Sequence, residues 1–173
     1  MAEIFWFAAY VRSCQERKVA QKLASRGIET YVPIQKVRRQ WSDRVKQVDK
    51  ILLPGIVFIH CDKTLRPTVF DITGGIRGFL SDRTDPNHKA LVVPDRQMND
   101  FIRVVNAMNG EEELDILECD IAAGDMVRVI RGPLSGFVCE CVQVRSRRKL
   151  IVRLGLLGSV AVSVDARDIV RES

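Results

Sequence analysis

The chain has 173 residues, 46% of them hydrophobic and 28% charged, and its 27 Lys and Arg outnumber its 22 Asp and Glu, which gives a formal net charge of +5. This balance argues against intrinsic disorder, and no apolar run approaches the ~18 residues of a membrane helix. The N-terminal stretch has no basic region or small-residue cleavage site, so we expect an unprocessed cytoplasmic protein without a membrane partner.

The charges are distributed unevenly along the chain. Residues 1–110 carry 18 bases and 11 acids, residues 111–120 carry six acids and no base, and residues 121–173 carry nine bases and five acids. This pattern predicts two basic domains, 1–110 and 121–173, joined by an acidic linker at 111–120. Polyanions are the expected partners of both domains.

The N-terminal residues predict a buried strand followed by a helix. The strand is "IFWFAAYV", and Ser13-Cys14-Gln15-Glu16 has the form of a capping box, in which the Ser and Glu side chains satisfy backbone amides at a helix start. Apolar residues then recur at helical spacing until Gly27, which is typical of a helix end.

Two further strands are expected next. "IETYVPIQKV" is rich in β-branched residues, and the near-continuous apolar run "ILLPGIVFIHC" predicts a strand buried on both faces. The polar segment between them, "RRQWSDRVKQVDK", predicts a hairpin or a long loop that stands off the sheet.

The rest of the first domain completes an α+β pattern. "PTVFDIT" predicts a short helix, Gly74-Gly75 a turn and "IRGFLS" a fourth strand. A final helix is expected with Asp95 as its N-cap, and its apolar stripe consists of Met98, Phe101, Ile102, Val105 and Met108. We therefore expect a small α+β domain with an antiparallel sheet.

Beyond the linker every predicted element is a strand. Apolar residues alternate in three runs: Val127 with Val129; Leu150, Val152 and Leu154; and Val160, Val162 and Val164. Turn signals at "RGPLSG", "RSRRK" and "GLLGS" separate the strands, and this spacing predicts a small, highly curved barrel.

Candidate catalytic and metal-binding residues are few. The five cysteines include no CxxC pair, and we expect Cys139 and Cys141 to lie on one strand face as core residues. His60 and His88 have no Cys, Ser or carboxylate arrangement at a known catalytic spacing, and there is no GxxxxGK[ST] loop. We therefore expect a protein that is not an enzyme and that needs no metal or cofactor.

Two motifs resemble those of a known family. Gly124, Asp125, Val127, Val129, Gly132, Pro133 and Gly136 resemble the KOW motif of SH3-like barrels in transcription elongation factors and some ribosomal proteins. The first 110 residues resemble the N-terminal domain of NusG, in the order Trp6 to Tyr10, the helix ended by Gly27, Leu52 to Phe58, and Gly74 to Phe79. The resemblance implies an α+β two-domain protein, in which a NusG N-terminal-type α/β sandwich with a small antiparallel sheet precedes an SH3-like β-barrel (KOW).

A narrower resemblance lies in "GIETYVPIQKVRRQWSDRVKQVDKILLP", above all in Arg39 to Arg44, which is similar to the UpxY proteins, NusG paralogues of Bacteroides-type bacteria. It implies an elongation factor that promotes antitermination of specific long operons of the capsular polysaccharide type. Two alternatives stay open: a housekeeping NusG factor for elongation and termination, and an RNA- or ribosome-binding KOW protein.

The resemblance also implies that an apolar concavity contacts the β′ clamp helices of RNA polymerase. The matching positions are Tyr10, Leu53, Pro54, Ile56 and Phe58. We assign Phe58 and Trp6 to the core, and we expect Tyr10 and Leu53 to be functional because they lie beside a Pro-Gly strand entry. Leu53 and Ile56 replace aromatic residues that are usual in the family, so the contact is expected to differ in strength.

A second implied contact is with upstream DNA or the non-template strand. The candidate residues are Arg12, Arg38, Arg39, Trp41, Arg44 and Lys46. Trp41 would stack on a base, and the cations would fix position rather than specify sequence. A charged hairpin that is only solvated is an equal alternative when the residues are considered without the family.

The barrel carries a third candidate surface, because Cys141 to Val164 contains no acid. Its cations form either an RNA- or ribosome-facing patch or the solvated side of a hairpin; they are Arg145, Arg147, Arg148, Lys149 and Arg153. Leu157-Gly158-Ser159 stands where housekeeping NusG has a Phe-Gly-Arg-type loop for Rho or a small-subunit ribosomal protein. The implied partners are RNA polymerase, DNA and nascent RNA, with a ribosomal protein as a further candidate, and a monomer is expected.

Overall fold

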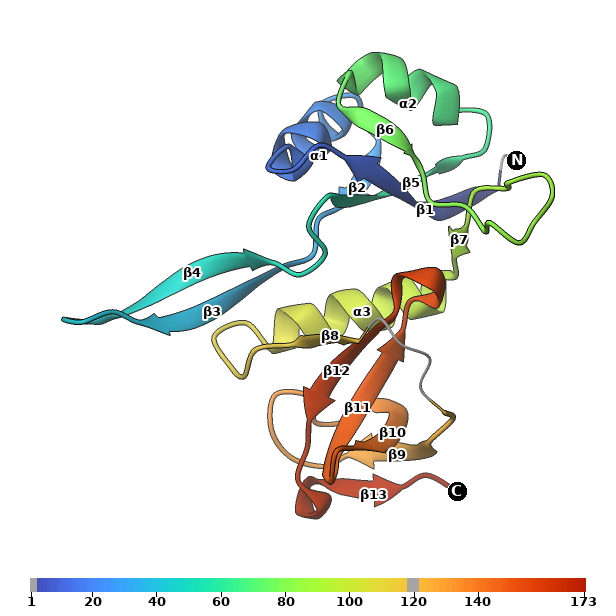
Figure 1. The fold of residues 1–173 in the computed structure, drawn as a ribbon. Helices are drawn as coiled ribbons and strands as arrows, with labels where there is room; N and C mark the ends of the chain where they lie inside the picture. The colour runs from blue at the N-terminus through green and yellow to red at the C-terminus, as the bar shows by residue number, and fades with distance from the viewer. Residues whose placement is uncertain (1–2, 118–121) are drawn as a thin grey trace. The chain divides into compact units, whose positions relative to one another are not determined.

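The computed structural model describes residues 3–117 and 122–173, which form three α-helices and antiparallel sheets (Figure 1). Contacts divide the chain into two compact units. The first unit comprises residues 1–33 and 53–98, and the second comprises residues 34–52 and 99–173. In the described residues no helix is long and apolar enough to cross a membrane.

The first unit is built on an antiparallel sheet with the N-terminal strand at its centre. Strand β1 (Ile4–Val11) lies between β5 (Ile56–Asp62) and β6 (Ile76–Phe79). Strand β2 (Glu29–Tyr31) pairs with β5, and β7 (Val92–Val93) pairs with β1. The predicted strands at the N-terminus, at "ILLPGIVFIHC" and at "IRGFLS" are confirmed.

Helices α1 (Glu16–Ala24) and α2 (Arg66–Thr73) lie on the same side of this sheet (Figure 1). One face of β1 and β5 packs with the helices in a core of ten buried residues: Phe7, Ala9, Val11, Val19, Leu23, Val57, Ile59, Cys61, Val69 and Ile76. The alternate residues on the opposite face, including Trp6 and Phe58, are buried as well, at 4% and 0% exposure. Burial of β5 on both faces confirms the interpretation of its apolar run.

The predicted capping box is wrong. Helix α1 begins at Glu16 after Gln15, and no side chain caps it. Ser13 lies one residue before Cys14, which adopts a positive φ of 63°. The carboxylate of Glu16 instead accepts a hydrogen bond of 2.8 Å from the backbone amide of Gly55, so it is committed to a partner far along the chain.

The predicted strand "IETYVPIQKV" is two strands in different units. Strand β2 ends at Tyr31, and β3 (Ile34–Gln40) begins after Pro33. A proline has no amide to donate to a sheet ladder, which explains the interruption. Strand β3 pairs with β4 (Val45–Ile51) in a two-stranded sheet, so the hairpin predicted for the polar segment is confirmed and extends over both strands.

Helix α3 (Asp95–Ala107) carries most of its predicted stripe. Met98, Phe101 and Val105 are at most 1% exposed, but Ile102 is only half-buried and Val104 takes its place in the core. The prediction that Ile102 belongs to the buried stripe is therefore wrong. Asp95 is the first helical residue rather than the N-cap, because the amide of Met98 bonds to the carbonyl of Pro94 at 3.0 Å.

The C-terminal sheet has six antiparallel strands. In sheet order they are β13 (Ile169–Arg171), β9 (Asp125–Val129), β10 (Val138–Val144), β11 (Arg147–Arg153), β12 (Ser159–Ser163) and β8 (Asp115–Leu117). Two short 3₁₀ helices, Gly155–Leu157 and Ala166–Asp168, connect strands. Strand β8 corrects the expectation of a linker at 111–120, because residues 115–117 pair with β12; residues 118–120 lie outside the described part.

The alternating apolar runs of this sheet point inward as predicted, with one exception. Val127, Val129 and the runs that begin at Leu150 and Val160 are buried, whereas Val164 is half-buried. A second cluster on the opposite face consists of Val142, Ile151 and Ala161 and was not anticipated. It is flanked by the ion pairs Glu140–Arg153 and Asp115–Lys149, whose side chains share that face by strand alternation.

Candidate functional site

Tyr10 is an exposed aromatic residue near the end of β1. Its side chain is 43% exposed, and it pairs directly with Ile56 of β5. The register between β1 and β6 shifts between Tyr10 and Val11. Such irregularities redirect side chains and interrupt pairing, and they are frequent beside functional sites.

The turn before β5 is fixed beside Tyr10. The amide of Ile56 bonds to the carbonyl of Leu53 at 3.2 Å, and Gly55 has a φ of +79°. This bond and the Pro-Gly pair fit a type II turn, in which the third residue needs a positive φ. The amide of Val11 also bonds to the carbonyl of Gly55 at 2.9 Å, so the turn is held from two sides, by β1 and by the Glu16 carboxylate.

The four residues proposed for polymerase are thus neighbours, but they are not equally accessible. Tyr10 and Pro54 are exposed, whereas Leu53 and Ile56 are only 8% and 6% exposed. The accessible apolar area is therefore narrower than the sequence suggested. The assignment of Phe58 and Trp6 to the core is confirmed.

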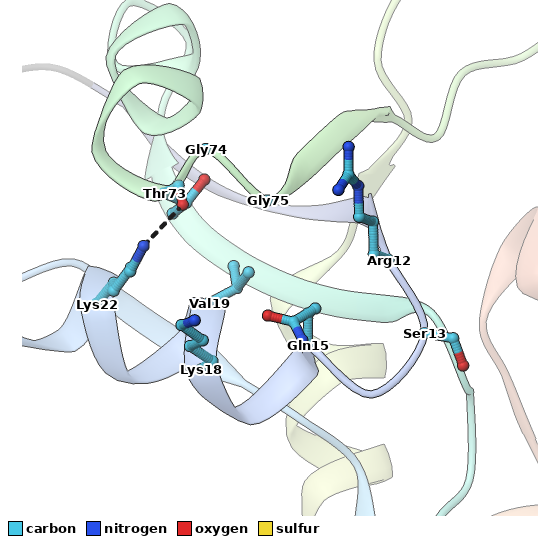
Figure 2. A pocket seen from close by; sticks show the side chains of 9 residues that line it. All are labelled: Arg12, Ser13, Gln15, Lys18, Val19, Lys22, Thr73, Gly74 and Gly75. Atoms are coloured by element: carbon cyan, nitrogen blue, oxygen red, sulfur yellow. Dashed lines mark hydrogen bonds between the residues drawn. The ribbon is translucent and has the colours of Figure 1, made fainter.

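A basic groove of about 360 Å³ lies at the N-terminal end of α1 (Figure 2). Arg12, Lys18 and Lys22 line it together with polar residues, and no acid is among the residues that line it. Lys22 donates to the carbonyl of Thr73 at 3.0 Å, as the dashed line in Figure 2 shows. The partial positive charge of the helix N-terminus adds to the attraction for anions.

Glycine makes the wall of this groove possible. A Cβ on Gly75 would lie 2.9 Å from Cγ2 of Val19, so only glycine allows the chain before β6 to approach α1 this closely. Of the groove cations, only Arg12 was predicted. Lys18 and Lys22 were missed, although their spacing of four residues on a predicted helix is a signal for a common face.

The hairpin cations lie on two faces of the hairpin. In the register of β3 and β4, Arg39 is opposite Lys46, and both alternate with Arg38, which is opposite Gln47. A single strand of nucleic acid on one face therefore cannot contact Arg38 and Arg39 in the same way. Five of the six predicted residues lie in this hairpin, but not on one surface, and Arg12 lies in the groove beside α1 instead.

Arg39 is already paired. Its guanidinium lies 2.9 Å from a carboxylate oxygen of Glu113, and the same carboxylate bonds to Lys50. Hydrogen bonds from Lys50 and Arg39 hold the pKa of Glu113 below its usual range. Glu113 thus competes with any phosphate for Arg39, which the sequence did not predict.

The tip of the hairpin joins an aromatic residue to cations. Trp41 and Val45 are 55% and 59% exposed, and the amide of Trp41 bonds to the carbonyl of Arg44 at 2.8 Å. An exposed indole beside an arginine suits stacking on a base with a phosphate nearby.

Gln35 at the base of the hairpin was also missed. It is 0% exposed, and its side-chain amide donates to the carbonyls of Met108 and Glu112 at 2.8 and 2.9 Å. Its side-chain oxygen accepts from the amide of Leu114 at 2.9 Å. Asn109 and Gly110 add two hydrogen bonds to the backbone of Lys36, at 2.8 and 2.7 Å, so the chain between α3 and β8 is fastened to the hairpin.

The residues of the glycine motif position β9 in the C-terminal sheet. A Cβ on Gly124 would lie 2.2 Å from the carbonyl oxygen of Cys141. Gly132 and Gly136 have φ values of 85° and 83° and frame the turn into β10, as the sequence predicts. These positions explain the motif by backbone geometry, without assigning it a ligand.

The cations predicted for the barrel patch divide into paired and unpaired groups. Lys149 pairs with Asp115, and Arg153 pairs with Glu140 at 2.7 Å. Arg145, Arg147 and Arg148 are exposed and have no ion pair among the described residues.

The cysteines and His60 are described by their burial and their neighbours. Across residues 3–117 and 122–173, no group of three or more His, Cys, Asp or Glu side chains could hold a metal ion. Burial raises the pKa of Cys139 to about 12, which disfavours a thiolate. His60 has a carboxylate neighbour that the sequence did not reveal: Nδ1 lies 2.6 Å from Glu29, and the ring stacks on Trp6.

Sequence comparisons relate this architecture to known proteins. The family described as "Transcription termination factor nusG" matches residues 5–102. The chain is 24% identical over 169 residues to the transcription termination/antitermination protein NusG of Streptococcus pyogenes serotype M1, covering 91% of this chain and 90% of that protein. It is 22% identical over 175 residues to the protein of the same name from Lactococcus lactis, covering 95% and 91%.

Comparison of structures gives a consistent fold. The solved structure "Domain interaction in Thermotoga maritima NusG" aligns with 99% of this chain and 98% of its own, with a TM-score of 0.51 and 20% identity. At this identity the likeness concerns the fold alone. Because the family match spans more than half of the chain, from Phe5 to Ile102, this protein belongs to the NusG family of transcription termination factors.

Proposed function

We propose that this protein is a transcription elongation factor that binds RNA polymerase and acts in antitermination. The observation that carries the proposal is Tyr10, exposed at a strand irregularity and set beside the rigid Leu53–Ile56 turn in a member of the NusG family. Protein interfaces are centred on such anchored aromatic side chains, which bury apolar area at little entropic cost. The proposed partner surface is the pair of β′ clamp helices.

The proposed mechanism is a shift between polymerase conformations. A factor that binds the closed clamp more tightly than the open, paused clamp stabilises the closed state by the difference between the two binding free energies. A difference of about 2–3 kcal/mol changes the ratio of the two states by roughly 30- to 150-fold. This requires no chemical step, in agreement with a function that is not enzymatic.

DNA contacts would add to this binding. The groove lined by Arg12, Lys18 and Lys22 suits the phosphates of the non-template strand or of upstream DNA, because it is basic, polar and lies at a helix N-terminus. Trp41 and Arg44 at the hairpin tip suit an unpaired base and its phosphate.

Polymerase binding is tested by co-purification with the intact protein and its Tyr10→Ala variant. We expect at least a tenfold loss of bound polymerase, since loss of an interface anchor commonly costs about 2 kcal/mol. Ile4→Ala is the matched control, because Ile4 is 54% exposed on the same face of the same strand, at its other end. Equal retention of polymerase by Tyr10→Ala and wild type would overturn the proposal.

The DNA contact is tested by crosslinking in an elongation complex with a photoreactive non-template strand. The double variant Arg12→Gln, Lys18→Gln is expected to lose the crosslink to the first unit while polymerase still co-purifies. An unchanged crosslink would remove the groove from the proposed DNA path.

The finer proposal is a specialised antiterminator of the UpxY type that acts on capsular polysaccharide operons and carries an SH3-like KOW barrel in its C-terminal sheet. Arg39 to Arg44 and the glycine motif support it. Genome-wide occupancy mapping separates it from a housekeeping factor: we expect enrichment on few operons, and occupancy of nearly all transcribed genes would favour the housekeeping alternative.

The loop before β12 stands where housekeeping NusG proteins are expected to bind Rho. Leu157-Gly158-Ser159 follows the exposed Leu156 and holds no aromatic residue. We therefore propose that Rho binding is lost, which an antiterminator tolerates. Strong capture of Rho by the intact protein would contradict this part of the proposal.

A further inference from the structure

The C-terminal part of the chain pairs most of its cations internally and leaves one group unpaired. Of the nine Lys and Arg in residues 122–173, five are held in ion pairs: Arg128, Lys149, Arg153, Arg167 and Arg171. Three of the other four follow one another at the turn between β10 and β11: Arg145, Arg147 and Arg148. Unlike most cations of this sheet, the three arginines at the end of the β10–β11 hairpin thus have no ion pair among the described residues.

The turn itself carries an arginine where glycine would be easier to accommodate. Val144 pairs with Arg147, so Arg145 and Ser146 form a two-residue loop, and their φ values are 48° and 67°. Turns with two positive φ values favour Asn-Gly and Gly-Gly, because other residues are strained there. Retention of an arginine in such a position points to a use for its side chain.

Two grooves adjoin the same hairpin end. Arg148 and Gln143 face one another across the strands and line both grooves, whose volumes are about 390 and 730 Å³. Ser146 and Arg147 line the larger groove. Two acids, Glu112 and Asp165, are also in its wall, and the charge of Asp165 is paired with Arg167.

We infer that the β10–β11 hairpin end binds the phosphodiester backbone of a single-stranded nucleic acid. Arg147 and Arg148 would hold it in the grooves that they line, and Arg145 would contact it from the adjoining turn. Arginine suits this ligand because its planar guanidinium donates two parallel hydrogen bonds to a phosphate. Gln143 and Ser146 supply neutral polar groups for sugar or phosphate oxygens. This site is separate from the proposed polymerase and DNA contacts and does not depend on them.

We expect this surface to bind the nucleic acid without recognising its bases. Phe137 is the only aromatic residue of residues 122–173, and it is 2% exposed. Without an exposed aromatic ring there is no platform on which bases could stack. Affinity should therefore be independent of sequence and should fall steeply with salt.

The test measures fluorescence anisotropy of a labelled 20-nucleotide RNA with the full chain at several salt concentrations. For Arg145→Gln, Arg147→Gln, Arg148→Gln we expect at least tenfold weaker binding. The slope of log affinity against log salt should decrease by about 2, which corresponds to three lost phosphate contacts on a single strand. The control variant, Arg83→Gln, Lys89→Gln, Arg96→Gln, removes the same charge from exposed positions and should lose less than twofold.

A second variant separates folding from binding. Arg145→Gly removes one charge and relieves the positive φ, so it should melt no lower than wild type and yet bind RNA more weakly. A DNA strand of the same sequence identifies the source of the phosphates: equal affinity assigns the site to either backbone, and preference for RNA assigns it to RNA. The proposal is overturned if the triple variant binds like the control, or if it keeps its RNA affinity and loses a protein partner instead.

Discussion

Gly124 illustrates how one missing methyl group sets the spacing of two strands. Its amide donates to the Glu140 carboxylate at 2.6 Å, and its Cα lies so close to β10 that a Cβ would meet both the Cys141 carbonyl and a Val142 methyl group. Glycine is required here for space, whereas Gly132 and Gly136 are required for their positive φ values. The sequence motif contains all three glycines, but only the structure distinguishes close packing from a positive φ as the reason for each.

We predict that Gly124→Ala lowers the free energy of unfolding by about 3 kcal/mol, because overpacking forces β9 away from β10. Urea denaturation measures the change. Gly78→Ala is the control, since a Cβ there would meet nothing within 4 Å, and it should leave stability unchanged or slightly raised. Equal midpoints for the two variants would contradict the close approach at Gly124.

Glu16 shows what sequence reasoning cannot reach at the scale of one residue. Its position three residues after Ser13 fits a local capping pattern. Its partner, the Gly55 amide, is 39 residues away, and only the folded sheet brings it within reach. A local pattern could not reveal that the carboxylate holds the Leu53–Ile56 turn instead.

At the scale of elements, the basic hairpin and the acidic segment after α3 form a pair. Glu113 neutralises Arg39 and Lys50, and its pKa is lowered chiefly by the hydrogen bond from Lys50. A lowered pKa in the folded state means that the pairing stabilises the fold above the unfolded pKa of about 4.3 and that this contribution is lost as the pH falls through the folded value.

We predict that Glu113→Gln reduces the stability at pH 7 by no more than about 1 kcal/mol, since both partners are partly exposed. The difference from wild type should shrink as the pH falls from the unfolded pKa of about 4.3 through the lower pKa of the folded Glu113 carboxylate. Urea titrations at a series of pH values measure it.

Glu111→Gln serves as the control, because Glu111 is exposed and has no ion pair among the described residues. If Arg39 contacts DNA as proposed, Glu113→Gln should also raise the affinity for DNA, whereas Glu111→Gln should raise it less. A stability difference that does not shrink at all as the pH falls below the unfolded pKa would show that the ion pair is not its cause.

At the scale of the whole molecule, the compact units do not follow the expected boundary at residue 110. The hairpin and most of α3 group with the C-terminal sheet. Gln35 explains the link to the hairpin, because its three hydrogen bonds tie residues 108–114 to β3. The division into domains 1–110 and 121–173 stays a prediction about which parts fold independently.

We predict that Gln35→Leu lowers the free energy of unfolding by about 3 kcal/mol, because it leaves buried carbonyls and the Leu114 amide without partners. Hydrogen exchange at Leu114 should accelerate with it. Gln40→Leu is the control, since the Gln40 amide is exposed and makes a single local bond. Unchanged protection of the Leu114 amide in Gln35→Leu would show that the amide is held by something else.

The sequence predicted what local periodicity encodes and missed what distant partners decide. The buried strand β5, the hairpin and the inward run at Val127 follow from apolar and polar alternation. Strand β8 was missed because its acidic composition resembles a linker, and its strand form depends on pairing with β12. The small exposed apolar area around Tyr10 was missed because the burial of Leu53 arises from packing of the whole fold.

The hydrogen bonds of Gln35 leave no flexible segment between the hairpin and β8. Leu114 is anchored to the hairpin, and the very next residue, Asp115, already belongs to β8. One residue spans only about 3.3 Å, so it cannot serve as a flexible linker. The C-terminal sheet can therefore move relative to the hairpin only if the Gln35 hydrogen bonds break or β8 separates from β12. A segment whose composition resembles a flexible linker would thus restrict this motion.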